Sequence, residues 1–94
     1  MNTVTIQISN IDAKLTQKEW VSFCDQVDRI VALLTDQVSF SGSSDSTQSV
    51  CWVAKINPCE VVTLERSLEP LRIRYHQDSI AVTHGMTKLI GAGN

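Results

Sequence analysis

The stretch from Thr16 to Leu34 reads TQKEWVSFCDQVDRIVALL, and it decides the fold more clearly than any other part of the chain. Thr16 and Glu19 have the spacing of a capping box, in which each side chain accepts the backbone N–H of the other residue. Apolar residues then recur at helical spacing and form one stripe: Trp20, Phe23, Cys24, Val27, Ile30, Val31 and Leu34. This pattern predicts an amphipathic helix that packs on another layer through a single face.

Strand patterns lie on both sides of this helix. Residues 3–9, TVTIQIS, alternate strictly between polar and apolar side chains, which is typical of a strand with one buried face. Val38 and Phe40 alternate with polar residues in the same way, so a short second strand is expected there. Residues 41–49, SGSSDSTQS, contain no apolar side chain and are predicted to form a flexible hairpin loop.

The predicted third strand, residues 50–56, has apolar side chains on both of its faces. One face carries Val50, Trp52, Ala54 and Ile56, and the other carries Cys51 and Val53. Such a pattern favours a central strand, or a strand whose second face contacts a partner.

A second helix is expected to begin at Asn57 and Pro58, a helix cap followed by a proline in the first turn. Pro70 would lie inside any longer helix, at a cost of about 3 kcal/mol. Residues 71–76 alternate at strand period, so they are predicted to be a fourth strand, paired through a turn at residues 77 and 78 with a fifth strand over residues 80–84. Residues 86–94 are expected to be a weakly ordered tail.

These elements predict one α+β domain over residues 1–94, in the order β-α-β-β-α-β-β. The first six match the split β-α-β unit of ferredoxin-like folds. We therefore expect a two-layer sandwich with both helices on one face of a mainly antiparallel sheet. Because proteins of this fold have many unrelated functions, the fold alone does not indicate which function this chain has.

Composition excludes several classes of protein. Eight basic and ten acidic residues give a net charge of -2, which argues against a general nucleic-acid binder. The longest apolar run, residues 30–34, is too short to span a bilayer, and the N-terminus does not resemble a signal peptide. The expectations are therefore a cytoplasmic location and no membrane partner.

The cysteines and histidines predict neither a disulfide framework nor a metal site. Cys24, Cys51 and Cys59 are an odd set without C-x-x-C spacing, and no cofactor motif is present. Cys59 is the best candidate for a reactive thiol, because it falls in the first turn of the second helix. It would need His76 or His84 as a base, so no catalytic residue is assigned.

Two groups of residues are candidates for binding a partner. Arg72, Arg74 and His76 would form a cationic row on the outward face of the fourth strand, where the alternative is a solvated edge. Cys51 and Val53 would lie on the open sheet face, flanked by the two arginines as a polar rim.

The main hypothesis is a small non-catalytic protein-binding module of the inhibitor, immunity or adaptor type, acting through its sheet surface. Its partner would be another protein or a second copy of the chain, since twofold dimers are the commonest oligomers, with a monomer as the alternative. The rival is a regulatory domain that binds a small molecule or an anion through its open sheet face, and an enzyme centred on Cys59 is a third hypothesis.

Overall fold

The computed structural model describes residues 2–44, 48–88, 90 and 91, with the backbone alone at residues 37, 39, 40, 43 and 44. Its elements follow in the order β1 (Asn2–Ser9), α1 (Gln17–Leu34), β2 (Gln37–Ser44), β3 (Ser49–Lys55), the short 3₁₀ turn η1 (Pro58–Glu60), α2 (Val61–Arg74) and β4 (Ala81–Met86). The protein is thus an α+β domain, as the sequence predicts.

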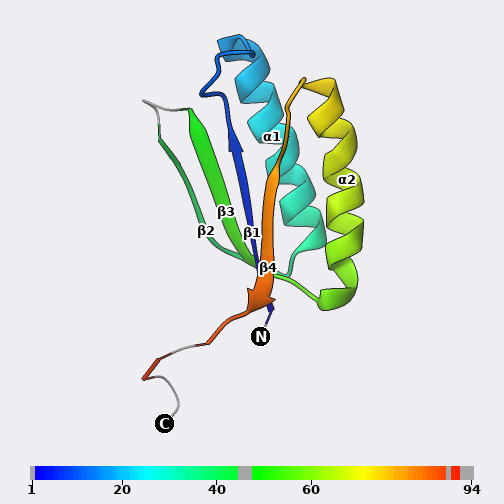
Figure 1. Cartoon of the computed structure of the whole chain (residues 1–94). Coiled ribbons are helices and arrows are strands. Elements are labelled where there is room, and N and C mark those ends of the chain that lie inside the picture. The colour runs from blue at the N-terminus through cyan, green and yellow to red at the C-terminus, as the bar shows by residue number, and fades with distance from the viewer. Residues whose placement is uncertain (1, 45–47, 89, 92–94) are drawn as a thin grey trace.

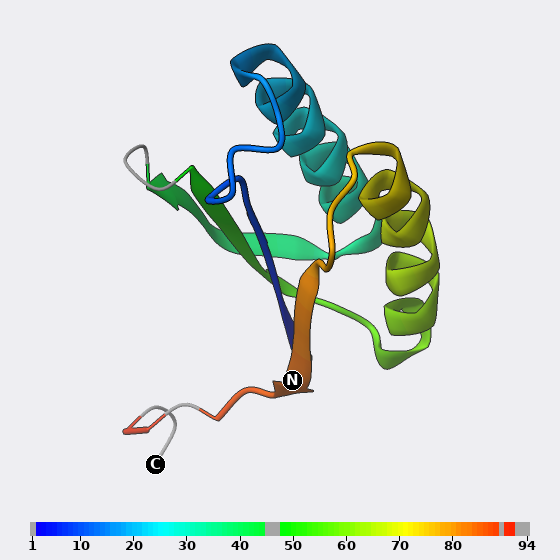
Figure 2. The ribbon, with the colours of Figure 1, turned by 45° about the horizontal axis from the view of Figure 1, so that its top comes forward.

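The four strands form one antiparallel sheet in the order β2-β3-β1-β4. α1 and α2 lie side by side on one face of this sheet, and within the described residues no helix covers the other face (Figure 1). Figure 2 shows the same two layers after rotation. The arrangement is consistent with the ferredoxin-like fold expected from the sequence, with one strand fewer.

The predicted first helix is confirmed, including the way it begins. The Glu19 N–H donates to Thr16 Oγ1 at 3.2 Å, and the Thr16 N–H donates to a Glu19 carboxylate oxygen at 2.9 Å. This reciprocal bonding lowers the pKa of Glu19. Of the predicted stripe, four residues are buried and three are partly buried against the core: Trp20, Phe23, Val27 and Val31, then Cys24, Ile30 and Leu34.

The core lies between the helices and the inner face of the sheet. β1 alternates as predicted, with Val4, Ile6 and Ile8 buried. Phe23 of α1 is fully buried and stacks on Tyr75 with ring centroids 4.9 Å apart. That contact joins the N-terminal part of α1 to the C-terminal end of α2.

The predicted fourth strand is wrong, because α2 continues through Pro70 to Arg74. Pro70 is exposed, so the Arg66 carbonyl that lacks its helical donor lies on the solvent side of α2. Leu71 and Tyr75 lie on the opposite side and are 7% exposed each. Burying these two large side chains offsets the cost of the proline.

The end of α2 is a Schellman motif rather than the start of a hairpin. The His76 N–H donates to the Ile73 carbonyl at 3.1 Å, and the Gln77 N–H donates to the Arg72 carbonyl at 2.9 Å. His76 takes the left-handed position with a φ of 54°. β4 then pairs with β1 and not with a neighbouring strand of a hairpin.

The second strand departs from strict alternation. Val38 lies opposite Ala54, but an irregularity of the β-bulge type follows, and Phe40 lies opposite Val53. The strict alternation predicted over residues 38–40 is thus interrupted in the backbone pairing with β3. The strand also continues to Ser44, into the predicted loop over residues 41–49, of which residues 45–47 lie outside the described part.

The C-terminal prediction is tested only in part, because residues 89 and 92–94 of the expected tail lie outside the described residues. Within the described ranges, neither helix is long and apolar enough to cross a membrane.

Candidate ligand-binding cleft

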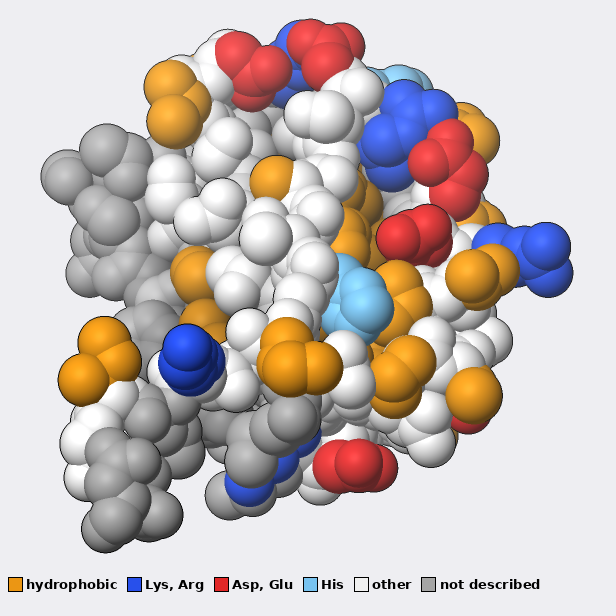
Figure 3. Space-filling model, turned by 60° about the horizontal axis from the view of Figure 1, so that its bottom comes forward, with side chains coloured by type: hydrophobic (Ala, Val, Ile, Leu, Met, Phe, Trp, Pro, Cys, Tyr) orange, Lys and Arg blue, Asp and Glu red, His pale blue; other side chains and the backbone are white. Residues whose placement is uncertain are grey.

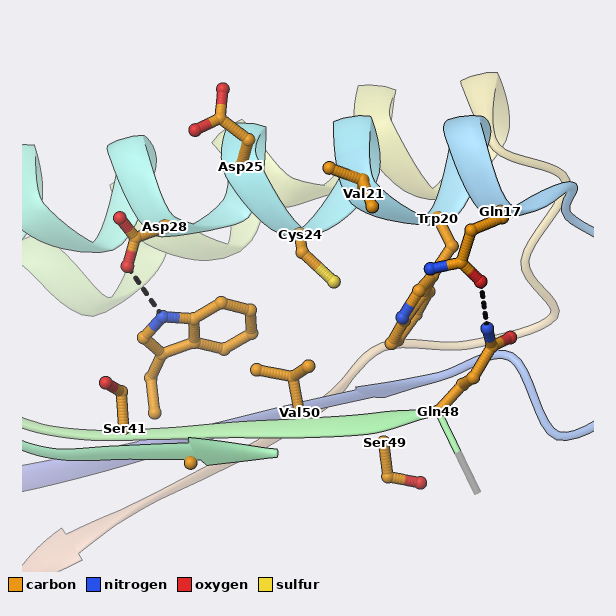
Figure 4. Close-up of a pocket in the computed structure, with 12 residues that line it drawn as sticks. Gln17, Trp20, Val21, Cys24, Asp25, Asp28, Ser41, Gln48, Ser49 and Val50 are labelled. Atoms are coloured by element: carbon orange, nitrogen blue, oxygen red, sulfur yellow. Dashed lines mark hydrogen bonds between the residues drawn. The ribbon is translucent and has the colours of Figure 1, made fainter. Parts of the chain in front are cut away.

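An open cleft of about 650 Å³ separates the outer flank of α1 from the hairpin of β2 and β3. Figure 4 shows it between the helix above and the strands below. Its described lining comes from the first two turns and the middle of α1 and from both strands: Gln17, Trp20, Val21, Cys24, Asp25, Asp28, Ser41, Gly42, Gln48, Ser49, Val50 and Trp52. Its size falls in the range of small-molecule sites, about 300–1,000 Å³.

The irregularity in β2 explains why this flank is open. It shifts the register so that Ser41, and not an apolar residue, lies opposite the buried Trp52. Gly42, which pairs with Cys51, follows and also lines the cleft. The small side chain of Ser41 thus lies where a large apolar side chain would otherwise fill the space below α1.

Both tryptophans of the chain line the cleft. The Trp52 indole N–H donates to Asp28 Oδ1 at 2.9 Å, which holds the ring and the carboxylate together at one end. Trp20 forms the wall at the other end, and Cys24 and Val50 point into the space between the rings (Figure 4). The cleft therefore combines aromatic and aliphatic walls with a carboxylate.

A chain of amides closes the end near Trp20. Buried Asn10 donates from Nδ2 to the Leu15 carbonyl at 3.0 Å and accepts the Leu15 N–H at Oδ1, also at 3.0 Å. The same Nδ2 donates to Gln48 Oε1 at 2.6 Å, and Gln48 Nε2 donates to Gln17 Oε1 at 2.6 Å. The loop before α1 is thus tied across the cleft to the start of β3.

Cys24 is the cysteine in the cleft, and it is not poised as a nucleophile. Burial raises the pKa of its thiol to about 11. The neutral thiol therefore predominates near pH 7, and Cys24 acts there as a small apolar wall.

Cys51 and Val53 alternate with the buried Trp52 and Ala54, so they lie on the face of β3 away from the core, as the sequence predicts. Val53 is paired with Thr5 and Cys51 with Gln7, and both side chains are half-buried. Figure 3 shows the molecule from below, with a histidine near the centre among uncharged side chains and charged side chains on several sides of it. The paired open-face positions Thr5, Gln7, Cys51 and Val53 all carry uncharged side chains.

Arg72, Arg74 and His76 do not flank that surface, because they belong to α2 and its cap in the helical layer. Arg72 Nε donates to Glu69 Oε1 at 3.0 Å, which lowers the pKa of Glu69, and Arg72 Nη1 donates to the Gln77 carbonyl at 3.1 Å. The Arg74 guanidinium lies 5.9 Å from the Tyr75 ring centroid. The cationic row predicted on a strand is therefore not formed.

The structure does not assemble a catalytic group around Cys59. Cys59 is exposed in η1, and its backbone N–H donates to the Asn57 side chain at 3.1 Å. His76 lies at the other end of α2, whose 14 residues extend about 20 Å. Across the described residues, no hydrogen bond joins Cys59 to His76 or His84, and no group of three potential metal ligands occurs.

No family model and no curated protein matches the sequence. Among solved structures, the aspartate kinase of Clostridium acetobutylicum is similar, with a TM-score of 0.56 and 17% identity over 88% of this chain. That kinase is described as an allosteric enzyme, and this chain spans only 18% of its length. At 17% identity the similarity concerns the fold alone.

Sequence reasoning missed the cleft, although one indication was present. Asp28 follows Cys24 by one helical turn and interrupts the edge of the apolar stripe. A carboxylate there suggests a polar contact at the border of the core. Its partner Trp52 and the roles of Asn10 and Gln48 depend on pairings between distant segments.

Proposed function

We propose that this chain is a non-catalytic regulatory domain that binds a small molecule in the cleft between α1 and the β2–β3 hairpin. The cleft itself carries the proposal: about 650 Å³ with tryptophan walls and a few polar groups at its ends. Small-molecule sites have this composition, apolar walls with a few polar groups that fix orientation. Ligand binding was the rival hypothesis from the sequence, which expected it on the open sheet face, whereas the cleft supports a site on the helical side.

The structural similarity supports the same proposal. The matched part is less than a fifth of an enzyme described as allosteric, so a domain of this fold occurs in a regulated protein. An effector that binds one of two conformations of the assembly more tightly shifts the equilibrium toward that conformation, and so changes the partner of the domain. This chain would supply the effector site, and the regulated protein would be its partner.

The two tryptophans make a direct test available. Because both line the cleft, a ligand there should change the intrinsic fluorescence as well as raise the melting temperature. We would screen a library of small metabolites by thermal shift and then titrate each hit by fluorescence. A hit that shifts both measurements at similar concentrations supports the cleft.

Two matched variants locate the site. Ser41→Phe fills the cleft from an exposed strand position, and Thr83→Phe adds the same ring at an exposed position of β4 outside the cleft. Ligand binding should be lost in Ser41→Phe and kept in Thr83→Phe. Equal binding by both variants, or no hit in the library, would reject the proposal.

A second candidate is a protein-binding module that uses the open sheet face. The half-buried Cys51 and Val53 favour it, because a patch of small uncharged residues can be desolvated at modest cost. We would measure the mass by light scattering for the wild type, for Val53→Asp and for Thr63→Asp on the exposed face of α2. A dimer that only Val53→Asp dissociates supports this candidate, and a wild-type mass near 10.4 kDa rejects self-association.

A further inference from the structure

The described lining of the cleft is negatively charged. Asp28 contributes a carboxylate beside Trp52, and Asp25 contributes a second at the rim. None of the described lining residues is Lys, Arg or His. Arg29 pairs with Asp25 at 3.1 Å, but its side chain is 77% exposed and lies outside the lining. Arg29 thus offsets part of the charge of Asp25, and Asp28 is the carboxylate whose like charge an anion entering the cleft would meet.

Asp28 is held in a position to accept from a ligand. Its Oδ1 receives the Trp52 indole N–H at 2.9 Å, which fixes the carboxylate beside the ring. An ionised carboxylate offers about four acceptor sites on two oxygens, and the indole uses one of them. Figure 4 shows this carboxylate at the end of the cleft. A donor group in the cleft can reach it without displacing the indole.

The remaining walls suit an apolar body next to that donor. Trp20 and Trp52 stand at the two ends of the space, with Cys24 and Val50 between them. A cation beside Asp28 would thus gain from the carboxylate, while its apolar part would contact the indole and aliphatic walls.

We infer that the ligand of this cleft is an organic ammonium ion with a compact apolar body, its ammonium group at Asp28 and its apolar part between Trp52 and Trp20. This inference rests on the proposed function and names the chemical class of the ligand. It predicts that the sign of the ligand's charge, more than its shape, decides the affinity.

Three probes of similar shape test the class: cyclohexylmethylammonium, cyclohexylmethanol and cyclohexanecarboxylate, each titrated at pH 7 by tryptophan fluorescence. The ammonium probe should bind about tenfold more tightly than the neutral alcohol, as a charge-assisted hydrogen bond to Asp28 would give. The carboxylate should bind more weakly than the alcohol. Raising the salt concentration should reduce the preference for the cation.

Asp28→Asn is the decisive variant, because asparagine keeps an oxygen acceptor for the Trp52 indole and removes the charge. Asp36→Asn removes one negative charge at an exposed residue outside the cleft lining. The tenfold preference should disappear in Asp28→Asn and persist in Asp36→Asn.

Equal affinity for the three probes, tighter binding of the carboxylate, or an unchanged preference in Asp28→Asn would overturn the inference. If none of the probes binds while a library compound binds in the cleft, the inference fails and the proposed function stands. If neither the probes nor the library binds, both fail.

Discussion

The two flanks of α1 meet the same sheet in different ways. On the inner flank, Phe23, Val27 and Val31 are fully buried against the sheet and α2. On the outer flank, Val21 is 57% exposed and Cys24 borders an open cleft. The helix has one regular pattern, so the difference comes from what lies opposite it.

The inner flank faces β1, which alternates without interruption and presents Val4, Ile6 and Ile8. The outer flank faces β2, where the shifted register presents Ser41 opposite Trp52. The core is tightly packed where the helix and the strand both place large apolar side chains between them. A cleft remains where one of the two elements places a small side chain there instead. A local irregularity in an edge strand can thus create a binding site without any change in the fold.

The largest contrast between the flanks should come from truncating one side chain on each. Phe23→Ala should lower the free energy of unfolding by about 3–5 kcal/mol, because it leaves a cavity and removes the stacking on Tyr75. Val21→Ala should change it by about 0.5 kcal/mol or less, as at other exposed positions. Urea denaturation measures both. Similar losses in the two variants would mean that the outer flank is packed as tightly as the inner one.

The next largest effect should occur at the closed end of the cleft. Asn10→Ala should cost about 1–3 kcal/mol, because it leaves the Leu15 N–H and carbonyl without their buried partner. Gln48→Ala removes only the bonds across the cleft, so its cost should be smaller while the emission of Trp20 shifts. If Gln48→Ala is more destabilising than Asn10→Ala, the bonds of Gln48 across the cleft stabilise the fold more than the bonds of Asn10 to Leu15 do.

A smaller effect is expected from the thiol of Cys24 as the pH rises. Its pKa is raised from 9.0 to about 11 by burial, so the folded state favours the neutral form. That stabilisation is complete below pH 9 and is lost as the pH rises through about 11, since the unfolded chain releases the proton first.

Alkylation of a variant with Cys24 as its sole cysteine measures this pKa. The rate should rise about tenfold for each pH unit between pH 8 and pH 10, and a ligand in the cleft should slow it. A variant that keeps only the exposed Cys59 is the matched control for reagent and pH. A rate for Cys24 that levels off below pH 9 would contradict the raised pKa.

The smallest effect should follow the loss of the surface ion pair at the rim. Asp25→Asn removes a pair with Arg29 whose members are 55% and 77% exposed, so the cost should be about 0.3–0.5 kcal/mol. Thermal unfolding at low and at high salt measures it, and the difference from wild type should shrink with added salt. A loss above 1 kcal/mol would show that Asp25 supports the outer flank in another way.

The local elements of the inner flank could be predicted from the sequence because their evidence is contained in short segments. The capping box of Thr16 and Glu19 and the stripe from Trp20 to Leu34 need no information from the rest of the chain. The alternation in β1 is equally local. Cys51 and Val53 were placed on the open face for the same reason, since side chains in a strand alternate between faces.

The prediction over residues 71–76 was wrong because two periods fit the same residues. Leu71, Ile73 and Tyr75 alternate as in a strand, but Leu64, Leu68, Leu71 and Tyr75 follow one another by four, three and four, which is the helical spacing. Because Pro70 is unfavourable inside a helix, the strand was the preferred interpretation. Its penalty is local, while the burial of Leu71 and Tyr75 that offsets it exists only in the folded chain.

The sequence by itself determined an α+β domain with a buried helix stripe and a half-apolar central strand. Only the tertiary structure decided that β4 pairs with β1, that the register of β2 shifts after Val38, and that Asp28 meets Trp52. Periodicity is a property of neighbouring residues, whereas a cleft is the space left between segments that are far apart in the chain. The candidate site lies in that space, so its chemistry became visible only when α1 and the β2–β3 hairpin were placed together.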